Sequence, residues 1–315
     1  MLPLGRAGQM SVSKAGVHML GVPFNSRGRA DGVALGPAAL REAGLVDALV
    51  AAGVELTDHG DVELGPSSTE RDPSSGLIDP DALVEMVRAV RTKVHAIRRT
   101  GAFPLVIGGD CPILLGCLGD RGLASPPGLL FVDGHEDAWL PSLSTTGEAA
   151  DMELGLALGL TVEGLPEGLA SVLPRLDRDR VVVIGARDAQ ELDEAGVTSI
   201  SDVVRVIRQD AVAAAGADHV GAEAASRIAV RGEWWFHVDL DVLSTDSLGA
   251  VDYRQPGGFD WETLEILTKR ALSSPGLIGW DVTIYNPDLD PKRTDAKRVV
   301  TYLSEALVAL AAQPG

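Results

Sequence analysis

The chain has 315 residues, of which 45% are hydrophobic and 23% are charged, as in ordered globular proteins rather than disordered chains. Its formal net charge of -18 opposes binding to nucleic acid or to an acidic membrane surface. The charge favours a small cationic substrate, or it serves only to keep the protein soluble. With two cysteines, no secretory signal pattern and no run of about 18 apolar residues, we expect a cytoplasmic protein without a disulfide framework.

Short apolar runs alternate with amphipathic segments along the chain. Residues 1–14 are polar and are expected to form a flexible N-terminus. Six runs predict strands buried on both faces, as in a parallel sheet: residues 16–21, 103–107, 128–133, 181–185, 234–239 and 277–282. The clearest helix begins after Asp79 as N-cap, with Pro80 in its first position, and stops at Gly101. Val299, Leu303, Leu307 and Leu310 predict a second helix near the C-terminus.

This alternation predicts an α/β fold. We expect a single three-layer, open and mainly parallel sheet with helices on both faces and right-handed connections. Residues 64–78 and 161–180 are rich in Pro, Gly, Ser and charge, and we interpret them as surface excursions rather than linkers. Residues 1–315 are therefore expected to form one domain.

Three acid-rich clusters follow three of the predicted strands. They are residues 108–111 (GGDC), 133–137 (DGHED) and 239–241 (DLD). Because ligands bind at the carboxyl ends of the strands in open α/β sheets, we expect the clusters to meet in one site. Residues two apart in an extended segment point to the same side, so each cluster can present its acidic side chains to one point.

The predicted site gathers Asp133, His135, Asp137, Asp239 and Asp241. Four carboxylates at the end of a buried sheet would repel one another unless cations neutralised them, which predicts bound divalent metal. Mixed carboxylate and imidazole ligation suits Mn²⁺ best, and Fe, Co, Ni or Zn would also fit. These five side chains are more ligands than one ion needs from the protein if it is also to hold a reactive water, which predicts two ions. Two ions about 3.5–4 Å apart would lower the pKa of a shared water and give hydroxide near neutral pH.

The clusters resemble the motifs G-G-D-H, D-A-H-x-D and S-x-D-x-D-x-x-D-P of the ureohydrolase family, which includes arginases, agmatinases and formimidoylglutamases. Segments such as GVPF at 21–24 and GARD at 185–188 agree with the family as well. The resemblance implies an arginase-like fold and a binuclear, metal-dependent hydrolase acting on C–N bonds of linear amidines. Its substrate would be a small guanidino or related amidine compound, and urea or a urea-like product would leave.

The resemblance also implies two metal positions that share two bridging aspartates. The ligands would be Cys111, Asp133, Asp137 and Asp239 for the first ion, and Asp133, His135, Asp239 and Asp241 for the second. A metal-bridging hydroxide would attack the guanidino carbon, and Asp137 would pass its proton to the departing amine.

Cys111 stands where most of the family has a histidine ligand. A thiolate is softer than imidazole and would shift the metal preference away from Mn²⁺. The alternative is a buried cysteine without a ligand role, but the match in position favours ligation. Cys117 has no such match and is expected in the core.

The substrate side departs further from the family. Ile284 occupies the position of the guanidinium-binding glutamate, and an apolar side chain cannot pair with a guanidinium. Asp281, Asp288 or Asp290 could replace it from nearby. We expect Asp281 to contact the substrate, as we expect of Asp188 and Trp139, although Trp139 could instead only cover the core. The positions that bind the α-carboxylate in arginases also differ, which disfavours L-arginine.

The arginase proton-shuttle histidine has no counterpart here. Glu148 and Asp151 could act as acid or base if burial raised their pKa values. For Asp151 we favour a different role, as the N-cap of a helix over residues 152–160. We expect His237 to hydrogen-bond behind the metals rather than bind one.

Two other functions fit the same fold. One is a metal-binding pseudoenzyme or regulatory protein, for which Ile284 is the best support. The other is a single-zinc amide deacetylase, whose relatives lack the paired-metal D-x-H-x-D motif. Retention of the carboxylate and histidine ligands favours the amidinohydrolase. No nucleic-acid or membrane partner is expected, and a homo-oligomer would agree with the resemblance.

Overall fold

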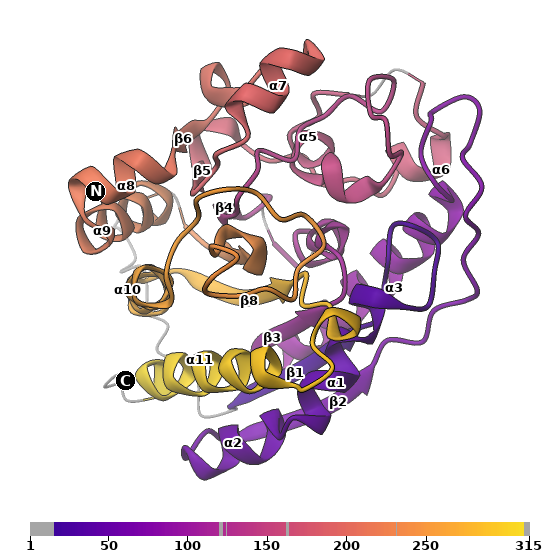
Figure 1. Ribbon diagram of the computed structural model, residues 1–315. Coiled ribbons are helices and arrows are strands. Elements are labelled where there is room, and N and C mark those ends of the chain that lie inside the picture. Colours follow the sequence, from indigo (N-terminus) through magenta and orange to yellow (C-terminus); the bar gives the residue numbers. More distant parts are fainter. Residues whose placement is uncertain (1–15, 120–121, 124, 162–163, 231, 312–315) are drawn as a thin grey trace, which may run out of the picture.

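Eight parallel strands form one open sheet at the centre of the computed structural model, within the described residues 16–119, 122–123, 125–161, 164–230 and 232–311. The order is β2-β1-β3-β8-β7-β4-β5-β6, and every neighbouring pair is parallel. The strands are β1 Val17–Val22, β2 Leu56–Asp61, β3 Phe103–Gly108, β4 Gly128–Val132, β5 Val181–Ile184, β6 Arg205–Ile207, β7 Trp234–Asp239 and β8 Leu277–Thr283 (Figure 1). The predicted flexible N-terminus, residues 1–14, lies outside the described residues.

The six predicted strands are confirmed, each to within one residue at either end. Sequence reasoning missed β2 and β6, which occupy the two edges of the sheet. An edge strand is open to solvent, so it does not need the apolar run that marks a central strand. Strand β2 is mostly exposed, and β6 has only three residues.

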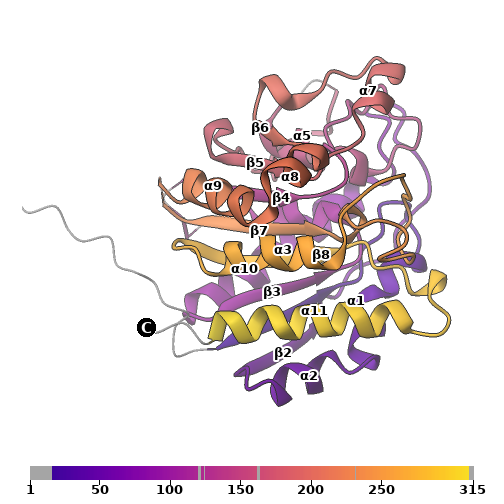
Figure 2. The ribbon, with the colours of Figure 1, turned by 60° about the vertical axis from the view of Figure 1, so that its left-hand side comes forward.

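Helices cover both faces of the sheet, which completes the predicted three layers (Figures 1 and 2). One face packs against α1 Gly36–Glu42, α2 Leu45–Ala51, α8 Gln209–Ala215, α9 Ala217–Ala229, α10 Trp261–Leu272 and α11 Thr294–Ala311. The other face packs against α3 Pro80–Arg99, α4 Leu114–Cys117, α5 Glu153–Leu158 and α6 Glu167–Ala170. Helix α7, Ala189–Ala195, follows β5.

Alternation along the buried strands divides the core between these faces. In β4, Leu130 and Val132 join one hydrophobic cluster, whereas Leu129 and Phe131 join the other. Helix α3 matches its prediction, because the Asp79 side chain accepts a hydrogen bond from the amide of Ala82 and the apolar stripe is buried. The helix predicted near the C-terminus is α11.

The predicted surface excursions contain little regular structure. Residues 64–78 form a loop that leads into α3, and the described part of 161–180 contains the short helix α6. None of the helices in the described ranges combines the length and the apolar character needed to cross a lipid bilayer.

Candidate metal centre

The three acid-rich clusters meet at one end of the sheet. Strands β3, β8, β7 and β4 are consecutive neighbours, and the clusters follow β3, β4 and β7 directly. Figure 2 shows β3, β7 and β8 side by side in the sheet. The parallel arrangement therefore places residues that are more than a hundred positions apart within hydrogen-bond distance of one another.

Asp133, His135 and Asp241 form the first group of donor atoms, all within 4.8 Å of one another. The Nδ1 atom of His135 lies 3.1 Å from Oδ2 of Asp241 and 3.5 Å from Oδ1 of Asp133. Burial alone would lower the pKa of His135, but the two carboxylates raise it well above its ordinary value. This concentration of negative charge around one imidazole suits a cation.

Cys111, Asp133, Glu153 and His237 form a second donor group, also within 4.8 Å of one another and fully buried. Asp133 belongs to both groups. Its Oδ2 atom, both carboxylate oxygens of Glu153 and Nε2 of His237 have no hydrogen-bond partner. Buried polar atoms are normally satisfied, and this set of thiol, imidazole and carboxylate donors is one that divalent metals take. The donors present therefore fit the predicted metal.

Asp281 fixes the orientation of His237 from behind. Its Oδ2 atom lies 2.6 Å from Nδ1 of His237, and its Oδ1 atom accepts a hydrogen bond of 2.5 Å from the indole of Trp235. Nε2 of His237 consequently faces the cluster, 3.9 Å from Oδ2 of Asp133. Asp281, which we expected to contact the substrate, is fully buried in β8 behind His237 and does not line the pocket described below.

Asp137 and Asp239 belong to neither donor group, but both line the adjacent pocket. Burial raises the pKa of Asp137 well above its ordinary value, and Asp133 and Glu153 add to the effect. Asp239 accepts hydrogen bonds of 2.6 Å from Sγ of Cys111 and from the amide of Asp241. Burial and the neighbouring carboxylates also raise the pKa of the Cys111 thiol, so its ionisation would require a cation.

A pocket of about 70 Å³ opens beside the donor groups. Its carboxyl-bearing lining residues are Asp137, Asp151, Asp188, Glu191, Asp239 and Asp241. Trp139 and Ile284 add apolar surface. A predominantly acidic pocket of this size favours a small cationic group over an anionic one.

Asp188 is a buried residue that lines this pocket and has one carboxylate oxygen without a partner. Its Oδ2 atom accepts a 2.9 Å hydrogen bond from the amide of Glu136, whereas its buried Oδ1 atom has no partner. Burial raises the pKa of Asp188 to about 6. The side chain therefore retains one acceptor for a ligand.

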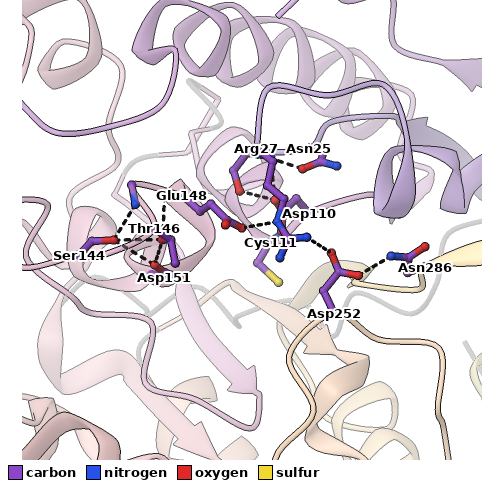
Figure 3. A network of polar contacts seen from close by, with 12 residues as sticks. Asn25, Arg27, Asp110, Cys111, Ser144, Thr146, Glu148, Asp151, Asp252 and Asn286 are labelled. Atoms are coloured by element: carbon purple, nitrogen blue, oxygen red, sulfur yellow. Dashed lines mark hydrogen bonds and ion pairs between the residues drawn. The ribbon is translucent and has the colours of Figure 1, made fainter. Parts of the chain in front are cut away.

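Asp151 is not the predicted N-cap. Helix α5 begins at Glu153 after Met152, which makes no side-chain capping bond. The Asp151 carboxylate instead accepts hydrogen bonds from Ser144 and Thr146, as Figure 3 shows. Hydroxyls on the preceding loop thus compete with the helix for this side chain.

Glu148 lies away from the expected acid/base position. It forms a 3.0 Å ion pair with Arg27, which also reaches Asp252 at 3.3 Å (Figure 3). Asp252 in turn accepts a hydrogen bond from Asn286. Glu148 is absent from the pocket lining, so the prediction that it handles protons there is not supported by its position.

Ile284 forms part of the pocket wall in an unusual backbone conformation. Its φ of 73° lies in the left-handed region, and its amide donates a 2.8 Å hydrogen bond to the carbonyl of Gly109. Neither suggested substitute reaches the pocket, because Asp288 accepts from the amide of Gly32 and Asp290 caps α11. An apolar side chain therefore does occupy this wall.

The comparisons with known proteins agree with this geometry. A family model described as "Arginase family" matches residues 15–309. The arginase of Staphylococcus aureus (strain MRSA252) is 27% identical over 305 residues, covering 94% of this chain and 99% of that protein. The structure of Bacillus caldovelox arginase has a TM-score of 0.80 at 23% identity and covers 95% of this chain and 99% of its own. Entamoeba histolytica arginase, solved with L-ornithine, has a TM-score of 0.80 at 18% identity, with 94% and 98% covered.

Proposed function

The chain belongs to the arginase family, and from this premise we propose that it is a binuclear metal-dependent amidinohydrolase for a small cationic guanidino or amidine compound. Membership makes it a ureohydrolase, a hydrolase of C–N bonds in linear amidines. The observation that carries the proposal is the pair of donor groups that share Asp133 beside an acidic pocket. The products would be an amine and urea or a urea-like compound.

The residues that would hold the metals surround Asp133. His135 and Asp241 share one donor group with it, Cys111 belongs to the other, and Asp137 and Asp239 line the adjacent pocket. A bound pair of divalent ions supplies a nucleophile near neutral pH by lowering the pKa of a shared water. Mn²⁺ suits the oxygen and nitrogen donors, and Fe, Co, Ni or Zn would also be accepted.

Asp137 is suited to moving a proton. Its carboxyl group lines the pocket, and burial together with Asp133 and Glu153 raises its pKa. A carboxyl group at this position can accept the proton that the nucleophile releases and deliver it to the departing amine, which is otherwise a poor leaving group. The left-handed φ of 38° at Asp137 turns the chain immediately after the metal loop.

The walls of the pocket favour a cation that carries apolar surface. The carboxylates supply the charge complement, while Trp139 and Ile284 supply a flat and a branched apolar contact. Because Ile284 cannot form an ion pair or hydrogen bond with a guanidinium, the unpartnered Oδ1 atom of Asp188 is our candidate for binding the substrate's cationic or N–H group.

Replacing Asp188 by asparagine is expected to lower kcat/KM by about 10- to 100-fold, mainly through KM, because a hydrogen bond to a charged group contributes about 1.5–3 kcal/mol. Steady-state kinetics on the fully metal-loaded protein measure this. Glu191→Gln is the matched control, since Glu191 lines the same pocket but is exposed and accepts from Gln255. Equal effects of the two substitutions would contradict the role of Asp188.

A panel of guanidino and amidine compounds tests the function itself. We expect the metal-loaded protein to release urea or a urea-like product from at least one member, and Asp137→Asn to lower that rate by about 10²- to 10⁴-fold as expected for loss of a proton-transfer group. Metal content is measured for both proteins. Two bound ions without turnover of any panel member would favour the second candidate, a metal-binding pseudoenzyme, for which Ile284 in the substrate wall is the specific support.

A further inference from the structure

We propose that Glu153 and His237 are themselves metal ligands, and that with Cys111 and Asp133 they form a four-donor site preferring a softer ion than Mn²⁺. The inference rests on the proposed function only in assuming that the centre binds metal. It differs from the ligand set implied by the family resemblance, in which Asp137 and Asp239 accompany Cys111 and Asp133.

The four donors come from separate elements and converge on one point. Cys111 follows β3, Asp133 follows β4, His237 lies within β7, and Glu153 is the first residue of α5. Their ligand atoms all lie within 4.8 Å of one another. In a tetrahedral site with bonds of about 2.0–2.3 Å, ligand atoms lie about 3.3–3.8 Å apart, so small adjustments would close the group around an ion.

Glu153 is the strongest single observation. Its side chain is fully buried, and neither carboxylate oxygen has a hydrogen-bond partner. Burial and the Asp133 carboxylate oppose its charge, and the neighbouring Asp137 carboxyl group offsets that charge only while it holds a proton. A buried carboxylate without a partner is costly, and a cation at this point would satisfy both oxygens.

His237 is prepared as a ligand by its surroundings. In the neutral ring, the 2.6 Å contact between Nδ1 and Asp281 places the proton on Nδ1 and leaves the lone pair of Nε2 facing the cluster. The ring also stacks on Phe131, with centroids 4.6 Å apart and planes at 17°. A carboxylate that orients the far nitrogen of a histidine is the usual outer support of a metal-binding imidazole.

The chemistry of the donors sets the metal preference. One thiol, one imidazole and two carboxylates form a mixed set typical of Zn²⁺ or Co²⁺ sites, whereas Asp133, His135 and Asp241 offer only oxygen and nitrogen. The two positions are therefore expected to differ in selectivity, so that the protein binds a mixed pair of ions when both kinds are supplied.

Cobalt titration of the metal-free full-length protein tests the assignment. Co²⁺ bound by Cys111 should give a thiolate-to-metal band in the near ultraviolet and intense visible bands of a four-coordinate ion. Glu153→Gln and His237→Gln are each expected to shift the visible bands and to weaken Co²⁺ at this position by at least about 10- to 100-fold, the loss typical even of outer-shell changes. Cys117→Ser is the matched control, because Cys117 is a buried thiol outside both donor groups.

Thermal unfolding separates a ligand from a residue that only supports the fold. At a pH high enough to ionise Glu153, Glu153→Gln removes a costly buried charge, so it should raise the melting temperature of the metal-free protein and lower that of the cobalt-loaded protein. A merely structural role would move both temperatures in the same direction, and that result would overturn the inference.

The outcomes distinguish this inference from the proposed function. A native protein that binds two ions, with cobalt spectra unchanged by Glu153→Gln and His237→Gln as by Cys117→Ser, overturns the inference and leaves the amidinohydrolase intact. A single bound ion whose bands shift in both variants supports the inference and contradicts the binuclear mechanism. A native protein that binds no Co²⁺ overturns both.

Discussion

Replacing Asp133 by asparagine is expected to lower kcat/KM by at least about 10⁴-fold and to remove both metal ions. Asp133 is the one residue common to the two donor groups, and its Oδ2 atom is buried without a partner between them. Losing its charge weakens both positions together, and the nucleophile is lost with them. Elemental analysis of the purified variant and urea release under saturating metal measure the two effects.

Asp151→Asn is the control for metal content. Asp151 is a partly buried carboxylate of the same pocket, but it lies outside both donor groups and is held by Ser144 and Thr146. It should retain both ions. An Asp133→Asn protein that kept two ions and near-native turnover would contradict the shared role of Asp133.

After removal of the metals, the protein is expected to lose stability as the pH rises. Burial raises the pKa values of Asp110 and Asp188 to about 6, and it raises those of Glu153, Asp137 and Asp239 in the same direction. A carboxyl group whose folded pKa is raised stabilises the fold fully below its unfolded pKa, and that stabilisation is lost as pH rises through the folded pKa. The metal-free protein should therefore lose stability from about pH 4 to above pH 6, by roughly 3 kcal/mol for each shift of two units.

Bound metal should oppose this loss most strongly at high pH, where the ligands are ionised. An ion present at about 1,000 times its Kd adds about 4 kcal/mol, which corresponds to a rise in Tm on the order of 10 °C. Calorimetry with and without divalent ion at pH 5, 6, 7 and 8 measures the trend. The expectation would be contradicted if the metal-free protein became more stable toward pH 8. It would also be contradicted if added metal raised the melting temperature equally at pH 5 and pH 8.

The central architecture could be predicted because each inner strand is buried on both faces and must be apolar. Strand β4 has no exposed residue, and neither does β3. Solvent at the sheet edge removes that requirement, so β2, with the polar sequence LTDHGD, carries no comparable signal. The excursions were recognised by composition alone, which cannot give their path across the surface.

The site could be predicted only where its residues follow a strand directly. Asp133, His135 and Asp241 lie on short segments whose geometry the strands dictate, so their convergence was accessible from spacing. Glu153 begins a short helix, and no rule of spacing connects it to the strand ends. The available signal was an acidic residue in the otherwise apolar run MELGLALGL, where a buried charge needs a partner.

The role of Asp281 could not be predicted without the register between β7 and β8. Strands β7 and β8 pair so that Asp281 lies beside His237, and only that pairing reveals the carboxylate as the support of the ring. Asp151 failed as a cap for a local reason, since Ser144 and Thr146 bind its carboxylate before the helix begins.

The backbone at Ile284 has a consequence for the electrostatics of the pocket. A branched residue with φ of 73° adopts a conformation that glycine would take with little strain, so isoleucine stands there against the conformational preference of its own backbone. Its side chain adds hydrocarbon surface to a pocket that several carboxylates line, and it excludes water from the volume that it fills. Lower local polarisability lengthens the reach of each charge, so an incoming cation would experience a stronger field than the same acids could exert in an open, hydrated cleft.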